Sequence, residues 1–77
     1  SSWYTGLSLN YERGSAIISQ EGVVKIIPNN LPNNIGSNYS VMLQKMGQGD
    51  LWVANKNNTY FNVAGTENLM FDWEIKW

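Results

Sequence analysis

The sequence contains no cysteine and no histidine among its 77 residues. These absences exclude disulfides, zinc sites built from thiolates and imidazoles, and the side chain that most often carries protons near neutral pH. A chain this short barely offsets its conformational entropy by burying apolar surface, so small folds usually need disulfides, a metal or partner subunits. We therefore expect no cofactor and no metal site, and we expect self-association.

Charge is also scarce. Five Lys plus Arg and six Asp plus Glu give a net charge of −1, which provides no electrostatic surface for nucleic acid or for an anionic membrane. No apolar run approaches the roughly 18 residues that a membrane span requires, so we expect a soluble domain. Because the chain starts at Ser1 rather than at Met, we expect it to be part of a longer polypeptide, with Ser1 left by natural processing or by cloning.

Hydrophobic residues make up 43% of the sequence and aromatic residues 13%, a composition typical of a folded protein. Short runs alternate between apolar and polar residues and are separated by Gly, Asn, Asp and Pro, without any sustained helical period. This pattern predicts an all-β fold, a small antiparallel β-sandwich of about six to seven strands. We expect one domain over residues 1–77, with a lead-in strand within 1–13 and the sandwich over 14–77.

The C-terminal half predicts four strands that follow one another as a meander. Residues 56–58 are predicted to form a hairpin turn because asparagine tolerates left-handed backbone. Residues 46–50 are predicted to form a turn because of their glycines, and residues 64–68 to form another that leads into the last strand. The predicted strands are Tyr39–Met46, Leu51–Asn55, Thr59–Val63 and Leu69–Trp77. Core-facing side chains are expected from alternation in the first and last of them, at Tyr39, Val41, Leu43, Leu69, Phe71, Trp73, Ile75 and Trp77.

The N-terminal half predicts up to three strands and a long connection. The strands are Tyr4–Glu12, Ser15–Ser19 and Val23–Ile27, with a hairpin turn at 20–22. Residues 28–38 are too rich in Pro, Asn and Gly for regular structure. Because Leu31 and Ile35 interrupt this polar stretch, we expect the loop to pack down and cross from one sheet to the other.

Several apolar residues occupy the strand positions opposite the expected core. Strands that are apolar on both faces are normally covered on both, so these residues predict an oligomer interface. They are Val24, Ile26, Met42, Trp52, Tyr60 and Met70. The alternative is a register error of one residue in some strands, since a single bulge exchanges the two faces.

The order of the strand sequences resembles the C-terminal β-domains of bacteriophage tail fibres and tail spikes. The resemblance covers residues 14–77, and Phe71-Asp72-Trp73-Glu74 is its distinctive segment. Residues 1–13 lie outside it, and Lys76-Trp77 replaces the usual Lys-Arg-like end. The other stretches that carry it are Gly14–Ser19, Gly22–Ile26, Tyr39–Gln44, Leu51–Lys56 and Tyr60–Val63.

The resemblance implies a non-enzymatic trimerisation domain of a phage tail fibre or spike. Such domains are typically parallel homotrimers that end the fibre, set the register of its three chains, and in some cases contact the host surface. The implied location is the virion, facing the host. Some relatives are removed by self-cleavage after assembly, but no nucleophile–base pair can be assigned to that chemistry here, and whether the domain is retained stays open.

Carbohydrate binding is the alternative function. Exposed aromatic rings beside amide and carboxylate groups suit the mixed apolar and polar faces of a sugar. The candidate rings are Trp3, Tyr4, Trp52, Tyr60 and Trp77, and the candidate polar partners are Asp50, Asn55, Asn57 and Asn58. Core or interface packing explains the aromatic residues equally simply, and turn formation explains the asparagines.

A glycosidase is the enzymatic reading that the carboxylates allow. Asp72 and Glu74 share a face of the last predicted strand about 6.5 to 7 Å apart, within the range for an acid–base pair. On a solvated face such carboxylates are more simply solubilising charges. We therefore assign no catalytic residue and expect no enzyme activity.

Overall fold

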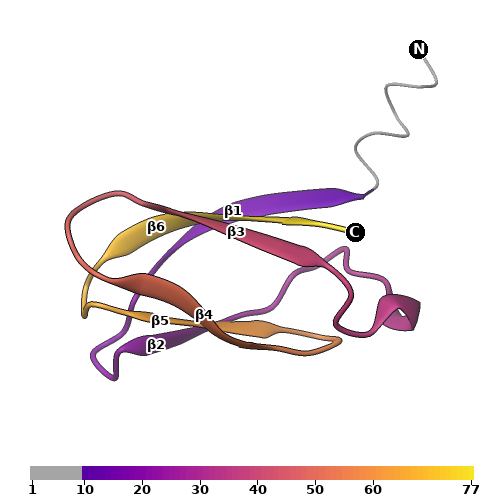
Figure 1. The fold of residues 1–77 in the computed structure, drawn as a ribbon, viewed down its shortest axis with the longest axis horizontal. Helices are drawn as coiled ribbons and strands as arrows, with labels where there is room; N and C mark the ends of the chain where they lie inside the picture. Colours follow the sequence, from indigo (N-terminus) through magenta and orange to yellow (C-terminus); the bar gives the residue numbers. More distant parts are fainter. Residues whose placement is uncertain (1–9) are drawn as a thin grey trace, which may run out of the picture.

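Six antiparallel strands form two three-stranded sheets that face each other (Figure 1). The computed structural model describes residues 10–77. Sheet A has the order β1-β6-β3 and sheet B the order β2-β5-β4. The strands are β1 Tyr11–Ile17, β2 Val23–Ile26, β3 Ser40–Lys45, β4 Leu51–Lys56, β5 Phe61–Gly65 and β6 Met70–Lys76. The predicted all-β sandwich is confirmed, with six strands in the described part of the chain.

Four of the five connections carry the chain from one sheet to the other, and three of them are short arches. They link β1 to β2, β3 to β4 and β5 to β6, and they lie together at the end of the sandwich that we call the arch end, residues 18–22, 46–50 and 66–69 (Figure 1). The predicted meander and the predicted hairpin at 20–22 are therefore wrong. The predicted hairpin between β4 and β5 is confirmed, because these two strands pair.

Backbone hydrogen bonds join the three arches to one another. The N–H of Asn68 donates to the carbonyl of Ile18 at 2.9 Å, and beside it the N–H of Gly65, the last residue of β5, donates to the carbonyl of Gly22 at 3.0 Å. On the other side, the N–H of Thr66 donates to the carbonyl of Asp50 at 3.0 Å. A side chain at Gly65 would collide with that same Asp50 carbonyl, so this close approach requires glycine.

The core lies between the sheets and is continuous through the arches. Its buried members are Ile18, Ile26, Tyr39, Phe61, Val63, Leu69, Phe71, Trp73 and Ile75. The predicted inward face of β6 is confirmed, and Trp77 packs partly buried against the same core. Ile18 and Leu69 lie inside arches and are buried there.

The connection between β2 and β3 crosses from sheet B to sheet A, as predicted, and includes a short 3₁₀ helix, Asn33–Ile35. Leu31 and Ile35 are partly buried against the core. The carboxylate of Glu12 in β1 accepts the backbone N–H groups of Asn29 and Asn30 at 3.0 and 2.9 Å. This side chain therefore fastens the start of the loop to β1.

Two predictions for the N-terminal half need correction. The predicted strands Tyr4–Glu12 and Ser15–Ser19 are not separate, because β1 runs without interruption from Tyr11 to Ile17. Residues 1–9, which include most of the predicted lead-in strand, lie outside the described residues. The predicted outward position of Val24 and Ile26 is also wrong: Ile26 is only 7% exposed, and Val24 packs against the core.

Candidate interaction surfaces

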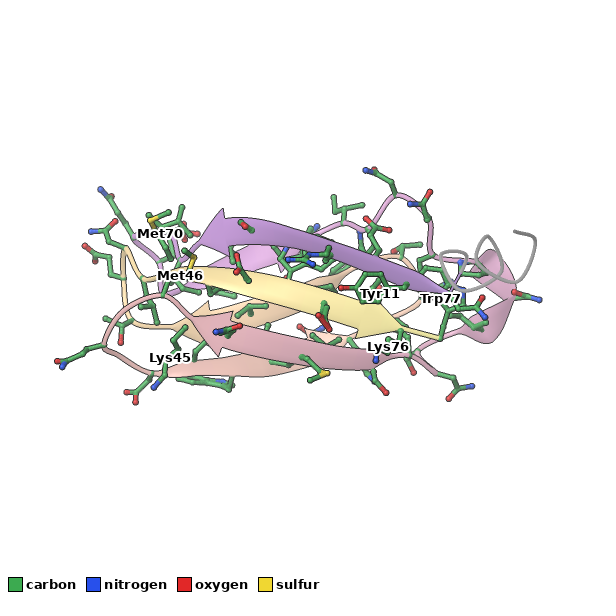
Figure 2. The ribbon with its side chains drawn as sticks, turned by 90° about the horizontal axis from the view of Figure 1, so that it is seen from above. Tyr11, Lys45, Met46, Met70, Lys76 and Trp77 are labelled. Atoms are coloured by element: carbon green, nitrogen blue, oxygen red, sulfur yellow. The ribbon has the colours of Figure 1, made fainter. Side chains whose placement is uncertain are left out.

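The outer face of sheet A carries an aliphatic row beside the arch end. Ile17 and Met70 are register partners on β1 and β6, and the backbone N–H of Met46 donates to the carbonyl of Met70 at 2.9 Å. Figure 2 shows Met46 and Met70 side by side at this end of the sheet. All three side chains are about half exposed, at 48, 53 and 59% for Ile17, Met70 and Met46. We call these three residues the aliphatic row.

Sheet B carries a matching row on its own outer face. Val23 and Trp52 both pair with Ala64, so the three residues cross all three strands next to the arch end. Trp52 is 53% exposed and Val23 is 36% exposed. We call Val23, Ala64 and Trp52 the indole row. Five of the seven large apolar side chains that the described residues leave exposed thus belong to these two rows.

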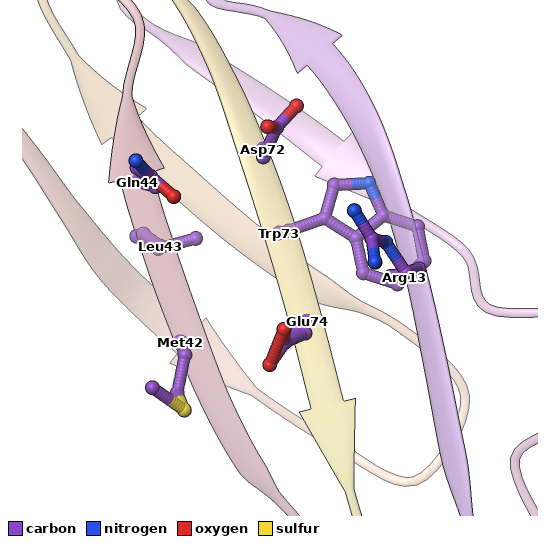
Figure 3. Close-up of a pocket in the computed structure, with 7 residues that line it drawn as sticks. All are labelled: Arg13, Met42, Leu43, Gln44, Asp72, Trp73 and Glu74. Carbon is purple, nitrogen blue, oxygen red and sulfur yellow. The ribbon is translucent and has the colours of Figure 1, made fainter.

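Away from the aliphatic row, the outer face of sheet A is charged. The hydroxyl of Ser15 donates to Asp72 Oδ1 at 2.7 Å, and the hydroxyl of Tyr11 donates to Glu74 Oε2 at 3.1 Å. These bonds hold both carboxylates toward β1. The two acids lie in a shallow depression of about 250 Å³, which Figure 3 shows between β1, β6 and β3. Its lining residues are Arg13, Met42, Leu43, Gln44, Asp72, Trp73 and Glu74.

The outer face of sheet B is polar but nearly uncharged beyond the indole row. The Asn62 side-chain amide donates to Asn55 Oδ1 at 2.6 Å, and Lys25 Nζ lies 4.4 Å from the centre of the Tyr60 ring. A bulge between Val53 and Asn55 shifts the register of β4. Because of this shift, Asn55 pairs with Asn62 on the outer side of the sheet.

The structure brings together three of the four residues predicted as the glycan contact. Trp52, Tyr60 and Asn55 share the outer face of sheet B, whereas Asn57 forms the turn between β4 and β5. Its Oδ1 atom accepts the backbone N–H groups of Thr59 and Tyr60 at 3.1 and 3.0 Å and the Thr59 hydroxyl at 3.3 Å. Hydrogen bonds within the turn therefore occupy this oxygen. Trp3 and Tyr4 lie outside the described residues.

The predicted interface residues divide between the two outer faces and the core. Met42 and Met70 are exposed on sheet A, and Trp52 is exposed on sheet B with Tyr60 half-buried nearby. Sequence reasoning missed exposed apolar residues next to these positions, namely Ile17, Val23, Ile27 and Met46. The run Val23–Ile27 does contain a signal for the outer side, because Lys25 shares its register with Val23 and Ile27, whereas Val24 and Ile26 form the wholly apolar side.

Tyr39 and Lys56 connect the sheets at the end opposite the arches. The Tyr39 hydroxyl donates toward the carbonyls of Asn57 at 2.7 Å and Tyr60 at 3.1 Å. Lys56 Nζ donates to the Tyr39 carbonyl and lies 5.1 Å from the centre of the Tyr39 ring. Burial raises the pKa of the Tyr39 phenol above its ordinary value, while the hydrogen bond to Asn57 opposes the rise.

Comparison with models of known protein families and with curated proteins gives no match. Within residues 10–77, no helix is long and apolar enough to cross a membrane. The same part of the chain contains no group of three or more histidine, cysteine, aspartate or glutamate residues placed to hold a metal ion.

Proposed function

We propose that this domain is a non-enzymatic assembly module, which associates with copies of itself as a homotrimer at the end of a phage tail fibre or spike. One observation carries the self-association. Large apolar side chains are gathered in two rows beside the arch end, instead of being scattered over the surface. Contiguous exposed apolar groups of this kind mark interaction sites in small proteins.

The gain from covering one such face is large on the scale of this domain. Fully burying a large apolar side chain contributes about 1.5 to 3 kcal/mol, so covering three half-exposed ones adds about 2 to 4 kcal/mol per subunit before ordering costs. A folded domain of this length is stable by only about 4 to 12 kcal/mol. Association would therefore supply a substantial share of the stability of the fold.

The number three and the phage setting rest on the resemblance carried by Phe71-Asp72-Trp73-Glu74 and the strand order. In that setting, three chains that share a shaft must start in register. A terminal module that gains stability only when three copies meet would set that register. The domain would then be part of the virion, where it can contact the host.

Carbohydrate binding is the second candidate, and a specific arrangement favours it. Trp52 lies on the outer face of sheet B together with the paired amides of Asn55 and Asn62. An exposed indole beside amide groups offers a sugar one apolar face and several hydrogen bonds. The two candidates compete for Trp52, which makes this residue the decisive one.

The test is the substitution Trp52→Ala, with the particle mass and glycan binding measured on the same samples. For the assembly function we expect the parent chain to have about three times its monomer mass of 8.7 kDa and the variant to dissociate at lower concentration. Asn58→Ala, at an exposed turn position, is the control and should keep the mass of the parent. A parent chain that stays at 8.7 kDa and binds a glycan that Trp52→Ala no longer binds would replace assembly with carbohydrate recognition.

A further inference from the structure

We infer that the outer face of sheet B, and not that of sheet A, is the surface through which the copies of this chain meet. The inference rests on the proposed self-association and identifies the face that performs it. Both outer faces offer an apolar row at the same end of the sandwich, so apolar content alone does not decide between them. The charged and polar side chains on the rest of each face distinguish the two.

The two faces differ in charge. The described outer face of sheet A carries four charged side chains, Arg13, Asp72, Glu74 and Lys76, whereas that of sheet B carries only Lys25. Charged groups are costly to remove from water unless they are paired, and they are depleted from the cores of protein interfaces. Trp and Tyr are enriched there, and sheet B supplies both, at Trp52 and Tyr60.

The polar groups of the sheet B face already satisfy one another in part. Asn62 donates to Asn55, and both amides are neutral. The Asp72 and Glu74 carboxylates also accept hydrogen bonds, from Ser15 and Tyr11, but covering them would remove two charges from water. The single cation stands on β2, an edge strand, with its Nζ over the Tyr60 ring. From an edge strand a lysine can bury its methylene stem and keep its ammonium group in water.

Threefold symmetry increases the effect of this difference in charge between the two faces. Around a threefold axis, a face that points toward the axis brings the groups nearest the axis close to their own copies in the other two subunits. On sheet A this arrangement would gather the Asp72 and Glu74 carboxylates of all copies. On sheet B it would gather Trp52, Val23 and Ile27, of which Ile27 is 65% exposed. The aliphatic row of sheet A then faces away from the other copies.

Two matched substitutions test the inference. Ala64 is the central residue of the indole row, and Met70 is the central residue of the aliphatic row. Particle mass is measured over a range of concentrations for the parent, Ala64→Arg and Met70→Arg, with circular dichroism as the check on folding. We expect Ala64→Arg to weaken association by about 30-fold or more, the loss typical of a central interface residue, and Met70→Arg to leave it within about threefold of the parent.

The remaining outcomes separate the two proposals. A parent chain that is monomeric at every concentration contradicts the assembly function itself. An oligomeric parent that dissociates on Met70→Arg, whether or not Ala64→Arg also has an effect, overturns the assignment to sheet B and leaves assembly standing. Should Ala64→Arg fail to fold, Trp52→Glu and Met46→Glu form a second matched pair at exposed positions, one on each face, with the same expected contrast.

Discussion

The indole ring of Trp73 lies directly against Gly14, its register partner across β1 and β6. A methyl group at Gly14 would come within 2.7 Å of Trp73 Cζ2, closer than non-bonded carbon atoms approach. Glycine normally weakens a strand, but here its missing side chain makes room for a ring that packs edge-on against Phe61, with 5.7 Å between ring centres. This contact leaves no room for a side chain at position 14 of β1.

Gly14→Ala should therefore destabilise the fold, even though alanine is at least as favourable as glycine within a strand. Overpacking of a filled core costs about 1 to 3 kcal/mol, and we expect a loss of that size in the free energy of unfolding measured with urea. Gly47→Ala is the control, because a methyl group there would lie an ordinary 3.5 Å from Leu69 Cδ1. Equal stability of the two variants would show that Trp73 does not need the space at Gly14.

Tyr39→Phe should cost about 1 kcal/mol at pH 7, because the carbonyl of Asn57 loses its hydroxyl donor. The cost should shrink at alkaline pH. Burial raises the pKa of Tyr39 in the folded chain, so the unfolded chain releases the phenolic proton at lower pH. The stabilisation is complete below about pH 10 and is lost as pH rises through the folded pKa.

The measurement for Tyr39 is urea unfolding of both proteins at pH 7 and pH 11. The difference in unfolding free energy between parent and variant should narrow at the higher pH. A difference that is the same at both pH values would mean that this phenol ionises equally easily in the folded and unfolded chains.

Asn57→Ala should destabilise the β4–β5 hairpin, because its side-chain oxygen accepts two backbone N–H groups within the turn. We expect a loss of about 1 to 2 kcal/mol in unfolding free energy, as for the loss of a helix cap that satisfies similar groups. Asn58→Ala, one position further on and exposed, should cost less than about 0.5 kcal/mol. Similar losses for the two variants would contradict the role assigned to Asn57.

Alternation in the sequence was sufficient to locate most strands and the inward face of β6. Phe71, Trp73 and Ile75 alternate with the charged residues Asp72, Glu74 and Lys76, and all three apolar residues are buried. It also placed Met42, Trp52 and Met70 outside correctly, since each has apolar neighbours on the other side of its strand. Period-two alternation reports which side of a strand is covered, and this information holds whatever the strand pairs with.

Alternation does not indicate which strands pair with one another in a sheet. Hairpins and arches both follow short turns rich in Gly, Asn and Asp, and they differ in whether the next strand bonds to the previous one or faces it across the core. The segments at 18–22 and 66–69 became arches, with Ile18 and Leu69 inside, where the sequence predicted hairpins. Val24 and Ile26 were misplaced, although Lys25 shares the register of Val23 and Ile27 and so indicates that this register is the outer one.

The two apolar rows could not be predicted as units for the same reason. Ile17, Met70 and Met46 come from three separate segments, and Val23, Ala64 and Trp52 from three others. Only the order of strands within each sheet brings them together. A reader of the sequence who knew the strands but not their neighbours would find single exposed residues, which are ordinary on protein surfaces.

Sedimentation equilibrium of the parent chain over a wide concentration range tests self-association most directly. We expect a particle of three chains at high concentration that dissociates on dilution, with a melting temperature that falls as the concentration falls. A single species of 8.7 kDa at every concentration, with a melting temperature that does not depend on concentration, would contradict it.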